Sequence, residues 1–236
     1  LEVIRKEKPT HIAVVFDPPG GSFRNEQFPE YKANRDETPE DIKRSVPWIL
    51  EILEGMNIPA ISEKGFEADD VIGYMAKKAE LQGFEVYMMT PDKDFGQLVS
   101  ERIKMYKPGR SGNPPEVWGP EEICEKFGVD NPLQVIDLLG MMGDSADNIP
   151  GIPGVGAKTA SKLLKQYGSL EGVIENSAEL KGKLKERVEE NVELATLSKS
   201  LATICLDIPM DIEWDSLNLE EPKADVLRET LENLEF

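Results

Sequence analysis

The stretch that most constrains this chain runs from Gly140 to Leu164, with the sequence GMMGDSADNIPGIPGVGAKTASKLL. Its middle part, residues 148–156, is too rich in Pro and Gly to form the interior of a helix or strand, so we expect a loop. Residues 158–160 (KTA) then open a segment with helical periodicity. A Gly-rich loop that leads into a helix presents unpaired backbone N–H groups, and these bind phosphate well.

Charged side chains lie on both sides of this loop. Upstream, Asp144 and Asp147 are three residues apart, and if the segment turns helically both lie on one face and could reach one metal ion. From residue 151 to 168 the only charged residues are three lysines that share one helical face: Lys158, Lys162 and Lys165. Metal ligands beside a phosphate-binding loop indicate an enzyme that holds a nucleic-acid backbone and cuts it.

Composition limits the other classes of protein. The 236 residues allow one large domain, or a domain with a small appendage. No apolar run has membrane-spanning length and no stretch is typical of a signal peptide, so we expect a cytoplasmic protein without a membrane partner. Cys124 and Cys205 are isolated, which predicts free thiols in a reducing compartment. The single histidine, His11, argues against histidine zinc sites and Ser-His-Asp triads.

The net charge of −18 argues, taken alone, against a nucleic-acid partner. The distribution of the charges matters more than their sum. Acidic residues cluster where a divalent cation would neutralise them, and basic residues are concentrated in short segments. We therefore expect slow association with DNA and a strict dependence on a divalent cation.

Two acidic clusters follow predicted strands. The apolar run of residues 11–16 (HIAVVF) is typical of a buried parallel strand and ends in Asp17. Asp92 and Asp94 follow a second such strand, residues 85–90. Open α/β sheets bind ligands at the carboxyl ends of their strands, and a right-handed crossover would place Asp17 and Asp92 at the same edge. For Asp17 alone, an ordinary turn residue is an equal alternative.

A third acidic cluster opens a predicted helix over residues 67–81 and consists of Glu67, Asp69 and Asp70. Acidic residues in the first turn of a helix interact favourably with its dipole, which is their usual role. Three in four residues exceed what a cap needs, because such close like charges repel each other. A hard cation would relieve that repulsion.

Residues 22–35 (SFRNEQFPEYKANR) mix basic and aromatic side chains. Such a segment can hold phosphates and stack on bases, although a solvated mobile loop is the alternative. The segment after it predicts a helix from about residue 39 to 56. Four of its apolar residues are expected to be buried: Val46, Ile49, Leu50 and Leu53.

These motifs resemble those of the flap endonuclease family, and within it the 5′-nuclease domains of bacterial DNA polymerase I. GDSADNIPGIPGVGAKTA is similar to the family's helix–three-turn–helix segment, and FDxxxxxFR with EYKxxR resembles its arch. EADD and TPDKD resemble its metal-binding motifs. The Walker spacing GxxxxGK[ST] is absent, which argues against a nucleotide-binding loop.

The resemblance covers nearly the whole chain and implies an α/β fold. It implies a parallel central sheet flanked by helices (a PIN-like nuclease core), a helical arch and a helix–three-turn–helix DNA-binding subdomain. The implied ranges are 1–148 for the core, about 22–50 for the arch, 149–210 for the subdomain and 211–236 for a segment leading to a polymerase part. Relatives begin with a further strand that carries a metal-binding aspartate upstream of Leu1, so the activity of the chain as given is an open question.

The resemblance also implies a magnesium-dependent 5′ nuclease with two metal ions, for which manganese can substitute, and a potassium ion at the hairpin loop. The implied partners are branched or nicked duplex DNA, RNA-primed DNA and the polymerase part of the same parent chain, with the protein as a monomer. The implied metal ligands are Asp17, Glu67, Asp69, Asp70, Asp92, Asp94, Asp144 and Asp147. The implied catalytic residues are Asp17, Arg24, Lys32, Glu67, Asp69, Asp92, Asp94 and Asp147. The implied DNA contacts are Arg24, Tyr31, Lys32, Arg35, Gly154, Gly156, Lys158, Thr159, Lys162 and Lys165.

Two alternatives remain open from the sequence. One is a binding module that holds branched DNA through the three lysines after the Gly-rich loop but cannot cut it. The other is a related metal-dependent ribonuclease with the same acid-lined sheet, against which the Gly-rich hairpin argues.

Overall fold

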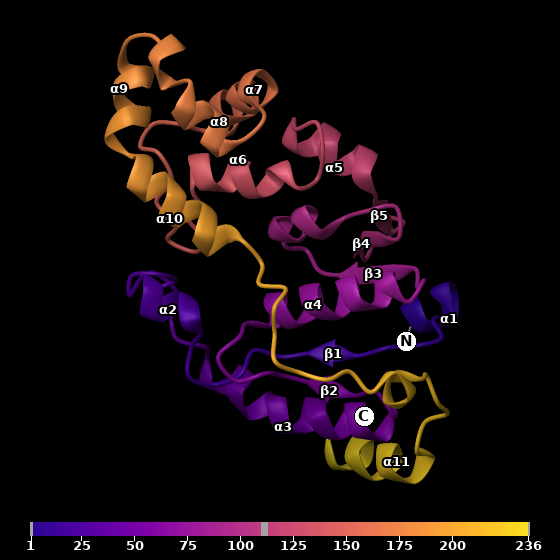
Figure 1. Ribbon diagram of the computed structural model, residues 1–236. Coiled ribbons are helices and arrows are strands. Elements are labelled where there is room, and N and C mark those ends of the chain that lie inside the picture. Colours follow the sequence, from indigo (N-terminus) through magenta and orange to yellow (C-terminus); the bar gives the residue numbers. More distant parts are fainter. Residues whose placement is uncertain (1, 110–112, 236) are drawn as a thin grey trace. The chain divides into compact units, whose positions relative to one another are not determined.

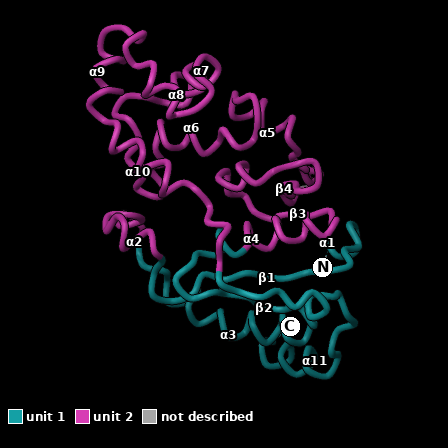
Figure 2. The backbone as a smooth tube through the Cα atoms, viewed as in Figure 1, with its two compact units in different colours: residues 1–22, 36–71, 209–236 teal, residues 23–35, 72–208 magenta. Residues whose placement is uncertain are grey.

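The computed structural model describes residues 2–109 and 113–235, and these residues form an α/β fold (Figure 1). They divide into two compact units (Figure 2). Unit 1 comprises residues 1–22, 36–71 and 209–236, and unit 2 comprises residues 23–35 and 72–208. The predicted boundary between residues 148 and 149 lies inside unit 2, and the predicted domain ranges stay a prediction.

The described residues of unit 1 include a two-stranded parallel sheet and three complete α-helices. Its strands are β1 (Val14–Val15) and β2 (Ala60–Ile61). Its helices are α1 (Glu2–Glu7), α3 (Glu40–Gly55) and α11 (Ala224–Asn233), and the 3₁₀ turn η3 (Trp214–Leu217) precedes α11. The strand predicted over residues 11–16 is shorter than expected, because His11 forms an antiparallel bridge with Asn218 instead of continuing β1.

Helix α3 forms where it was predicted, but it buries less than expected. Leu53 is buried, whereas the side chains of Val46, Ile49 and Leu50 are 36–42 % exposed, so the prediction is wrong for these three residues. Helix α11 packs against α3, and a Cβ added at Gly55 would lie 2.9 Å from the side chain of Leu227. This packing covers the C-terminal end of α3 and leaves the middle of its apolar stripe exposed.

Unit 2 contains a mixed sheet and most of the helices. The sheet has the order β3 (Val86–Met89), β4 (Ile103–Lys107) and β5 (Glu116–Trp118), with β3 parallel and β5 antiparallel to β4. The helices are α2 (Phe23–Gln27), α5 (Pro120–Phe127), α6 (Gln134–Met142), α7 (Ala157–Tyr167), α8 (Leu170–Glu175), α9 (Lys183–Glu190) and α10 (Val192–Ala202). The 3₁₀ turns are η1 (Lys93–Leu98) and η2 (Ser177–Glu179). The described strands thus form two sheets, one in each unit, and each sheet contains a parallel strand pair, so the expected α/β fold is confirmed.

The core of unit 2 is built around α6, which packs against α10. The helices approach closely, since a Cβ at Gly140 would lie 3.0 Å from the Cα of Lys199. The ammonium group of Lys199 contacts Asp137 at 2.6 Å and Glu171 at 2.7 Å, which ties α10 to α6 and α8. This packing fixes the start of the loop that follows α6.

Helix α4 (Ala68–Leu81) begins in unit 1 and ends in unit 2, because the division falls between Val71 and Ile72. None of the helices in the described ranges is long and apolar enough to cross a membrane.

Candidate functional site

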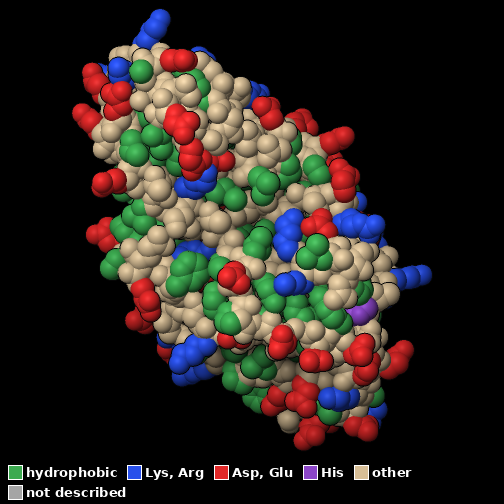
Figure 3. Space-filling model, viewed as in Figure 1, with side chains coloured by type: hydrophobic (Ala, Val, Ile, Leu, Met, Phe, Trp, Pro, Cys, Tyr) green, Lys and Arg blue, Asp and Glu red, His purple; other side chains and the backbone are tan. Residues whose placement is uncertain are grey.

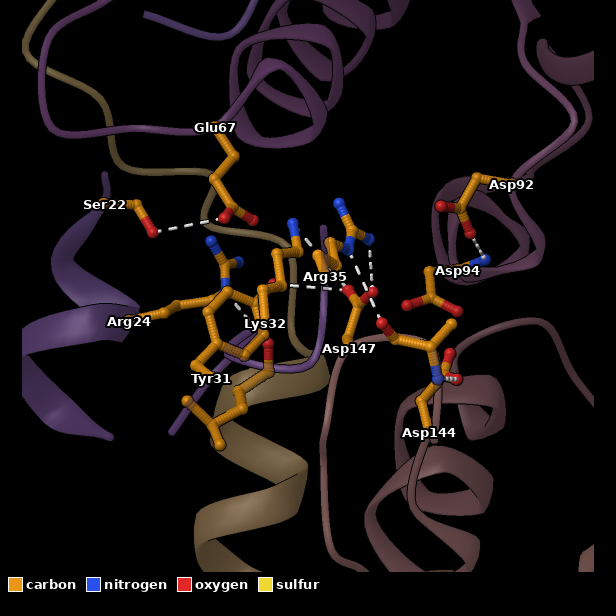
Figure 4. A network of polar contacts seen from close by, with 12 residues as sticks. Ser22, Arg24, Tyr31, Lys32, Arg35, Glu67, Asp92, Asp94, Asp144 and Asp147 are labelled. Atoms are coloured by element: carbon orange, nitrogen blue, oxygen red, sulfur yellow. Dashed lines mark hydrogen bonds and ion pairs between the residues drawn. The ribbon is translucent and has the colours of Figure 1, made fainter. Parts of the chain in front are cut away.

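In unit 1, acidic side chains cap the N-terminus of α4. Asp17 Oδ1 accepts a hydrogen bond from the Ala68 N–H at 2.8 Å. Asp70 is buried and accepts from the Glu67 N–H at 3.0 Å, while the Ser22 hydroxyl donates to Glu67 Oε1 at 3.3 Å (Figure 4). The bonds to Asp17 and Asp70 satisfy backbone N–H groups that have no partner within the helix. Asp69 stands beside Asp70 in the first turn. The metal-binding role of these acidic residues stays a prediction.

In unit 2, Asp94 carries the most unusual carboxylate. Asp92 caps η1 by accepting a hydrogen bond from the Asp94 N–H at 3.0 Å. Asp94 Oδ1 is buried and has no hydrogen-bond partner among the described residues. Burial, together with the nearby charges of Asp92, Asp144 and Asp147 and against the opposing effect of Lys93, raises the pKa of Asp94 to about 7. A buried oxygen without a donor, surrounded by other carboxylates, is the environment that a hard cation relieves.

Asp144 and Asp147 lie in a turn, so the condition of a shared helical face is not met, and a metal ion held by both stays a prediction. The segment is closed by backbone hydrogen bonds between Asp144 and Ile149, at 2.8 and 2.9 Å. Asp144 Oδ1 accepts from the Ala146 N–H at 2.9 Å, a local bond that competes with helix formation. The two carboxylates therefore take different partners: Asp144 contacts Lys93 Nζ at 2.6 Å, and Asp147 contacts side chains of the segment before α3.

Three side chains of residues 31–35 meet at Asp147 (Figure 4). Arg35 Nη2 donates to Asp147 Oδ1, Lys32 Nζ lies 3.8 Å from Asp147 Oδ2, and the Tyr31 hydroxyl donates to the same oxygen at 3.4 Å. The ring of Tyr31 is only 4 % exposed and belongs to the core of unit 2. Stacking of Tyr31 on a DNA base stays a prediction, and it would require this ring to leave the core.

Arg24 is also buried. Its guanidinium group donates to the Leu201 carbonyl at 2.9 Å and to the Thr203 carbonyl at 2.7 Å. These carbonyls lie at the C-terminus of α10, where intrahelical donors run out and a cation is stabilised by the helix dipole. In this structure Arg24 holds α2 against α10, and a contact with the scissile phosphate stays a prediction.

The donor set fits a hard divalent cation by its chemistry. Three carboxylates of unit 2 lie within electrostatic range of Asp94: Asp92, Asp144 and Asp147. Oxygen-only ligand sets bind magnesium, manganese or calcium. Within residues 2–109 and 113–235, no group of three or more His, Cys, Asp or Glu side chains is already arranged to hold an ion, and two of the four carboxylates are paired with Lys or Arg side chains.

The Gly-rich hairpin has buried anchors and an exposed tip. The side chains of Ile152 and Val155 are buried in the core, and the Val155 N–H donates to the Ile152 carbonyl at 2.9 Å. Gly154 has φ +76°, and Arg187 donates to its carbonyl at 3.2 Å. Gly156 caps α7 with φ −98°, and a Cβ added there would meet nothing within 4 Å.

Helix α7 confirms the predicted periodicity. Ala160, Leu163 and Leu164 are buried, and Thr159 is partly buried. The three predicted lysines are exposed on the opposite side: Lys158, Lys162 and Lys165. Although Asp and Glu side chains are spread over the face in Figure 3, α7 has none in its first turn, so its N-terminus remains favourable for an anion.

The fold is that of known 5′ nucleases. A structure of the T5 D15 protein co-crystallised with metal ions superposes with a TM-score of 0.74 at 24 % identity, covering 98 % of this chain and 88 % of that one. The catalytic core of Rad2 in complex with a DNA substrate gives a TM-score of 0.56 at 19 % identity, covering 93 % and 72 %.

Sequence comparison then shows the family. The model of the 5′-3′ exonuclease N-terminal resolvase-like domain matches residues 1–128, and that of the 5′-3′ exonuclease C-terminal SAM fold matches residues 130–225. The chain belongs to the 5′-3′ exonuclease family.

Two relatives differ in how much of them the chain covers. It is 42 % identical to DNA polymerase I of Bacillus caldotenax over 217 residues, which are 92 % of this chain and 25 % of that protein. It is 37 % identical to a 5′-3′ exonuclease of Aquifex aeolicus (strain VF5) over 236 residues, which are 100 % of this chain and 79 % of the relative. The chain thus spans about a quarter of the polymerase I relative.

Proposed function

We propose that this chain hydrolyses phosphodiester bonds of DNA and RNA at 5′ flaps, nicks and primers, as a monomeric nuclease part of a cytoplasmic, polymerase I-like parent protein. The observation that carries the proposal is the buried, unpartnered oxygen of Asp94 within range of three further carboxylates. The chain's membership of the 5′-3′ exonuclease family and the exposed tip of its Gly-rich hairpin support the same function.

The proposed ligands in unit 2 are Asp92, Asp94, Asp144 and Asp147, and those in unit 1 are Asp17, Glu67, Asp69 and Asp70. Magnesium or manganese ions held there would supply the Lewis acidity that activates water and stabilises the attacking and leaving oxygens. Lys32 and Arg35 are proposed to orient the scissile phosphate, since both cations already lie beside Asp147. The exposed tip of the hairpin and the lysine face of α7 would hold duplex phosphates, with a potassium ion at the hairpin carbonyls.

Lys158→Ala is expected to weaken duplex binding without sequence preference, because an interaction with the phosphate backbone carries no base information. The slope of log affinity against log salt concentration should become shallower by about 0.9, because the variant neutralises one phosphate fewer. Fluorescence anisotropy at several salt concentrations measures this slope. Lys77→Ala, which removes a lysine paired with Glu80 elsewhere in unit 2, is the control. An unchanged slope for Lys158→Ala would show that this lysine is only solvated.

Gly156→Ala is expected to affect DNA binding more than the stability of the fold. A Cβ at Gly156 meets nothing within 4 Å, and its φ of −98° suits any residue. The free energy of unfolding should therefore change by less than about 1 kcal/mol, mostly through the weaker N-cap. The affinity for duplex DNA should fall at least fivefold, because the methyl group occupies the space where a phosphate approaches the α7 N-terminus. Unchanged affinity would mean that no DNA phosphate approaches the N-terminus of α7 this closely.

The test of the proposed function is cleavage of a 5′-flap duplex with and without magnesium, by this chain and by an N-terminally extended version. We expect metal-dependent release of the flap at least by the extended protein. If both proteins bind the flap duplex but neither cleaves it, the second candidate is favoured, a branched-DNA-binding module. The observation behind this candidate is that the carboxylates of Asp144 and Asp147 are paired with Lys93 and Arg35 rather than free for a metal ion. Cleavage of single-stranded RNA without dependence on a 5′ end would favour the ribonuclease alternative.

A further inference from the structure

Two segments of unit 2, residues 30–35 and 144–148, are joined by hydrogen bonds that do not involve any carboxylate. The side-chain amide of Asn34 donates to the Ser145 carbonyl at 2.7 Å. In the opposite direction, the amide of Asn148 donates to the Glu30 carbonyl at 2.7 Å. Between them, the Lys32 N–H donates to the Asp147 carbonyl at 2.9 Å. We call the pair Asn34 and Asn148, with these three bonds, the amide clamp.

The backbone at the clamp is strained on both sides. Lys32 has φ +57° and Asn148 has φ +56°, in the left-handed region that residues other than glycine rarely adopt. Asparagine tolerates this conformation better than most residues, because its short polar side chain can form local hydrogen bonds, and lysine lacks this compensation. Such conformations persist only where several surrounding contacts hold them in place, and they are often found at functional sites. The clamp supplies the contacts that hold both residues in place.

The ion pairs at Asp147 could not hold the segment in the same way. The side chain of Arg35 is half exposed, so its pair with Asp147 is partly screened by solvent, and Lys32 Nζ lies 3.8 Å from the carboxylate, too far for a hydrogen bond. They also use the carboxylate oxygens of Asp147 that a cation would need (Figure 4). The acceptors of the amide clamp are all backbone carbonyls. A cation that binds the carboxylate oxygens of Asp147 therefore leaves the clamp's hydrogen bonds in place.

We propose that Asn34 and Asn148 are positioning residues that fix residues 30–35 on the loop 144–148 independently of the Asp147 carboxylate. Lys32 and Arg35 then keep their places when a divalent cation binds Asp147, and their cationic groups become available to a phosphate. The role of these two side chains toward phosphate rests on the proposed function. The clamp itself rests on the hydrogen bonds and the backbone conformation.

Trypsin provides a direct test, because opening of the clamp exposes the Lys32–Ala33 bond. Asn148→Gly removes the amide while keeping the backbone free to adopt positive φ, and Asn34→Ala removes the other amide. Each single variant is expected to accelerate cleavage of this bond about fivefold, and the double variant about 25-fold, as measured by mass spectrometry under conditions where cleavage follows the open population. Asp147→Asn, or magnesium added to the wild-type chain, should change the rate less than twofold.

Asn57→Gly is the matched control. Asn57 has φ +53°, and its amide donates to the Glu221 carbonyl in unit 1, so the variant loses the same kind of bond away from the clamp. It should leave the Lys32–Ala33 bond as protected as in the wild type. An equal acceleration in Asn57→Gly, no acceleration in the double clamp variant, or an acceleration by Asp147→Asn as large as that of the clamp variants would overturn the proposal.

A kinetic readout connects the clamp to the reaction. In an active N-terminally extended protein, the double clamp variant should lower kcat for flap cleavage at least tenfold with KM changed less than threefold, while Asn57→Gly leaves both unchanged. Wild-type kcat in the double variant would overturn the positioning role. If the extended wild type does not cleave at all, the proposed function fails, and the tryptic rates still decide whether the clamp holds the segment.

Discussion

Asp94→Asn is expected to lower kcat for flap cleavage at least 100-fold in an active N-terminally extended protein, while stabilising the metal-free form. The carboxylate is buried and Oδ1 has no partner within the described ranges, so its charge is tolerated only with a cation nearby. Losing such a ligand removes several kcal/mol of transition-state stabilisation. The neutral amide removes repulsion from Asp92, Asp144 and Asp147, which should raise the metal-free free energy of unfolding by about 1–3 kcal/mol.

Two measurements check this prediction together: flap cleavage, and thermal unfolding with and without millimolar magnesium. Wild-type protein should gain stability from magnesium because the ion binds the native state preferentially, and Asp94→Asn should gain less. Asp130→Asn, an exposed acid of unit 2, is the control and should behave like the wild type. Cleavage at the wild-type rate in Asp94→Asn would remove this residue from the metal site.

Elements with strong local periodicity could be predicted from the sequence. Helix α4 and strand β3 appear within one or two residues of the expected ranges, and helix α7 begins within one residue of its expected start. Their signals are local: acidic residues open α4, glycine precedes α7, and a short apolar run forms β3. The acidic residues of TPDKD were also found this way, because they follow directly on that strand.

What could not be predicted depends on partners far away in the sequence. Arg24 is a residue type that often contacts phosphate, but its guanidinium group donates hydrogen bonds to the carbonyls of residues 201 and 203. Tyr31 and Asp147 are 116 positions apart in the sequence, so they meet only when distant segments pack together. The amide of Asn148 likewise binds a carbonyl 118 residues away, so its neighbours in sequence contain no signal for the clamp. Secondary-structure propensity and periodicity are properties of each segment alone, whereas these contacts depend on which segments pack together.

Gly151→Ala is expected to be among the most destabilising single substitutions in unit 2. Gly151 has φ +62°, and a Cβ there would lie 2.3 Å from the Gly143 nitrogen and 2.6 Å from the Met142 carbonyl carbon. These are backbone atoms that cannot rotate away, unlike the end of a side chain. Strain at positive φ and overpacking together should lower the free energy of unfolding by about 3 kcal/mol or more. Urea denaturation measures this decrease.

Two further glycines separate the contributions to that decrease. Gly168 has φ +81° with nothing within 4 Å of an added Cβ, so Gly168→Ala reports the strain of positive φ alone, about 1 kcal/mol. Gly156→Ala carries neither penalty. The order of destabilisation should therefore be Gly151, then Gly168, then Gly156. Equal destabilisation at Gly151 and Gly168 would contradict a tight approach between residues 143 and 151. In that case the turn that presents Asp144 and Asp147 would be held by its hydrogen bonds alone.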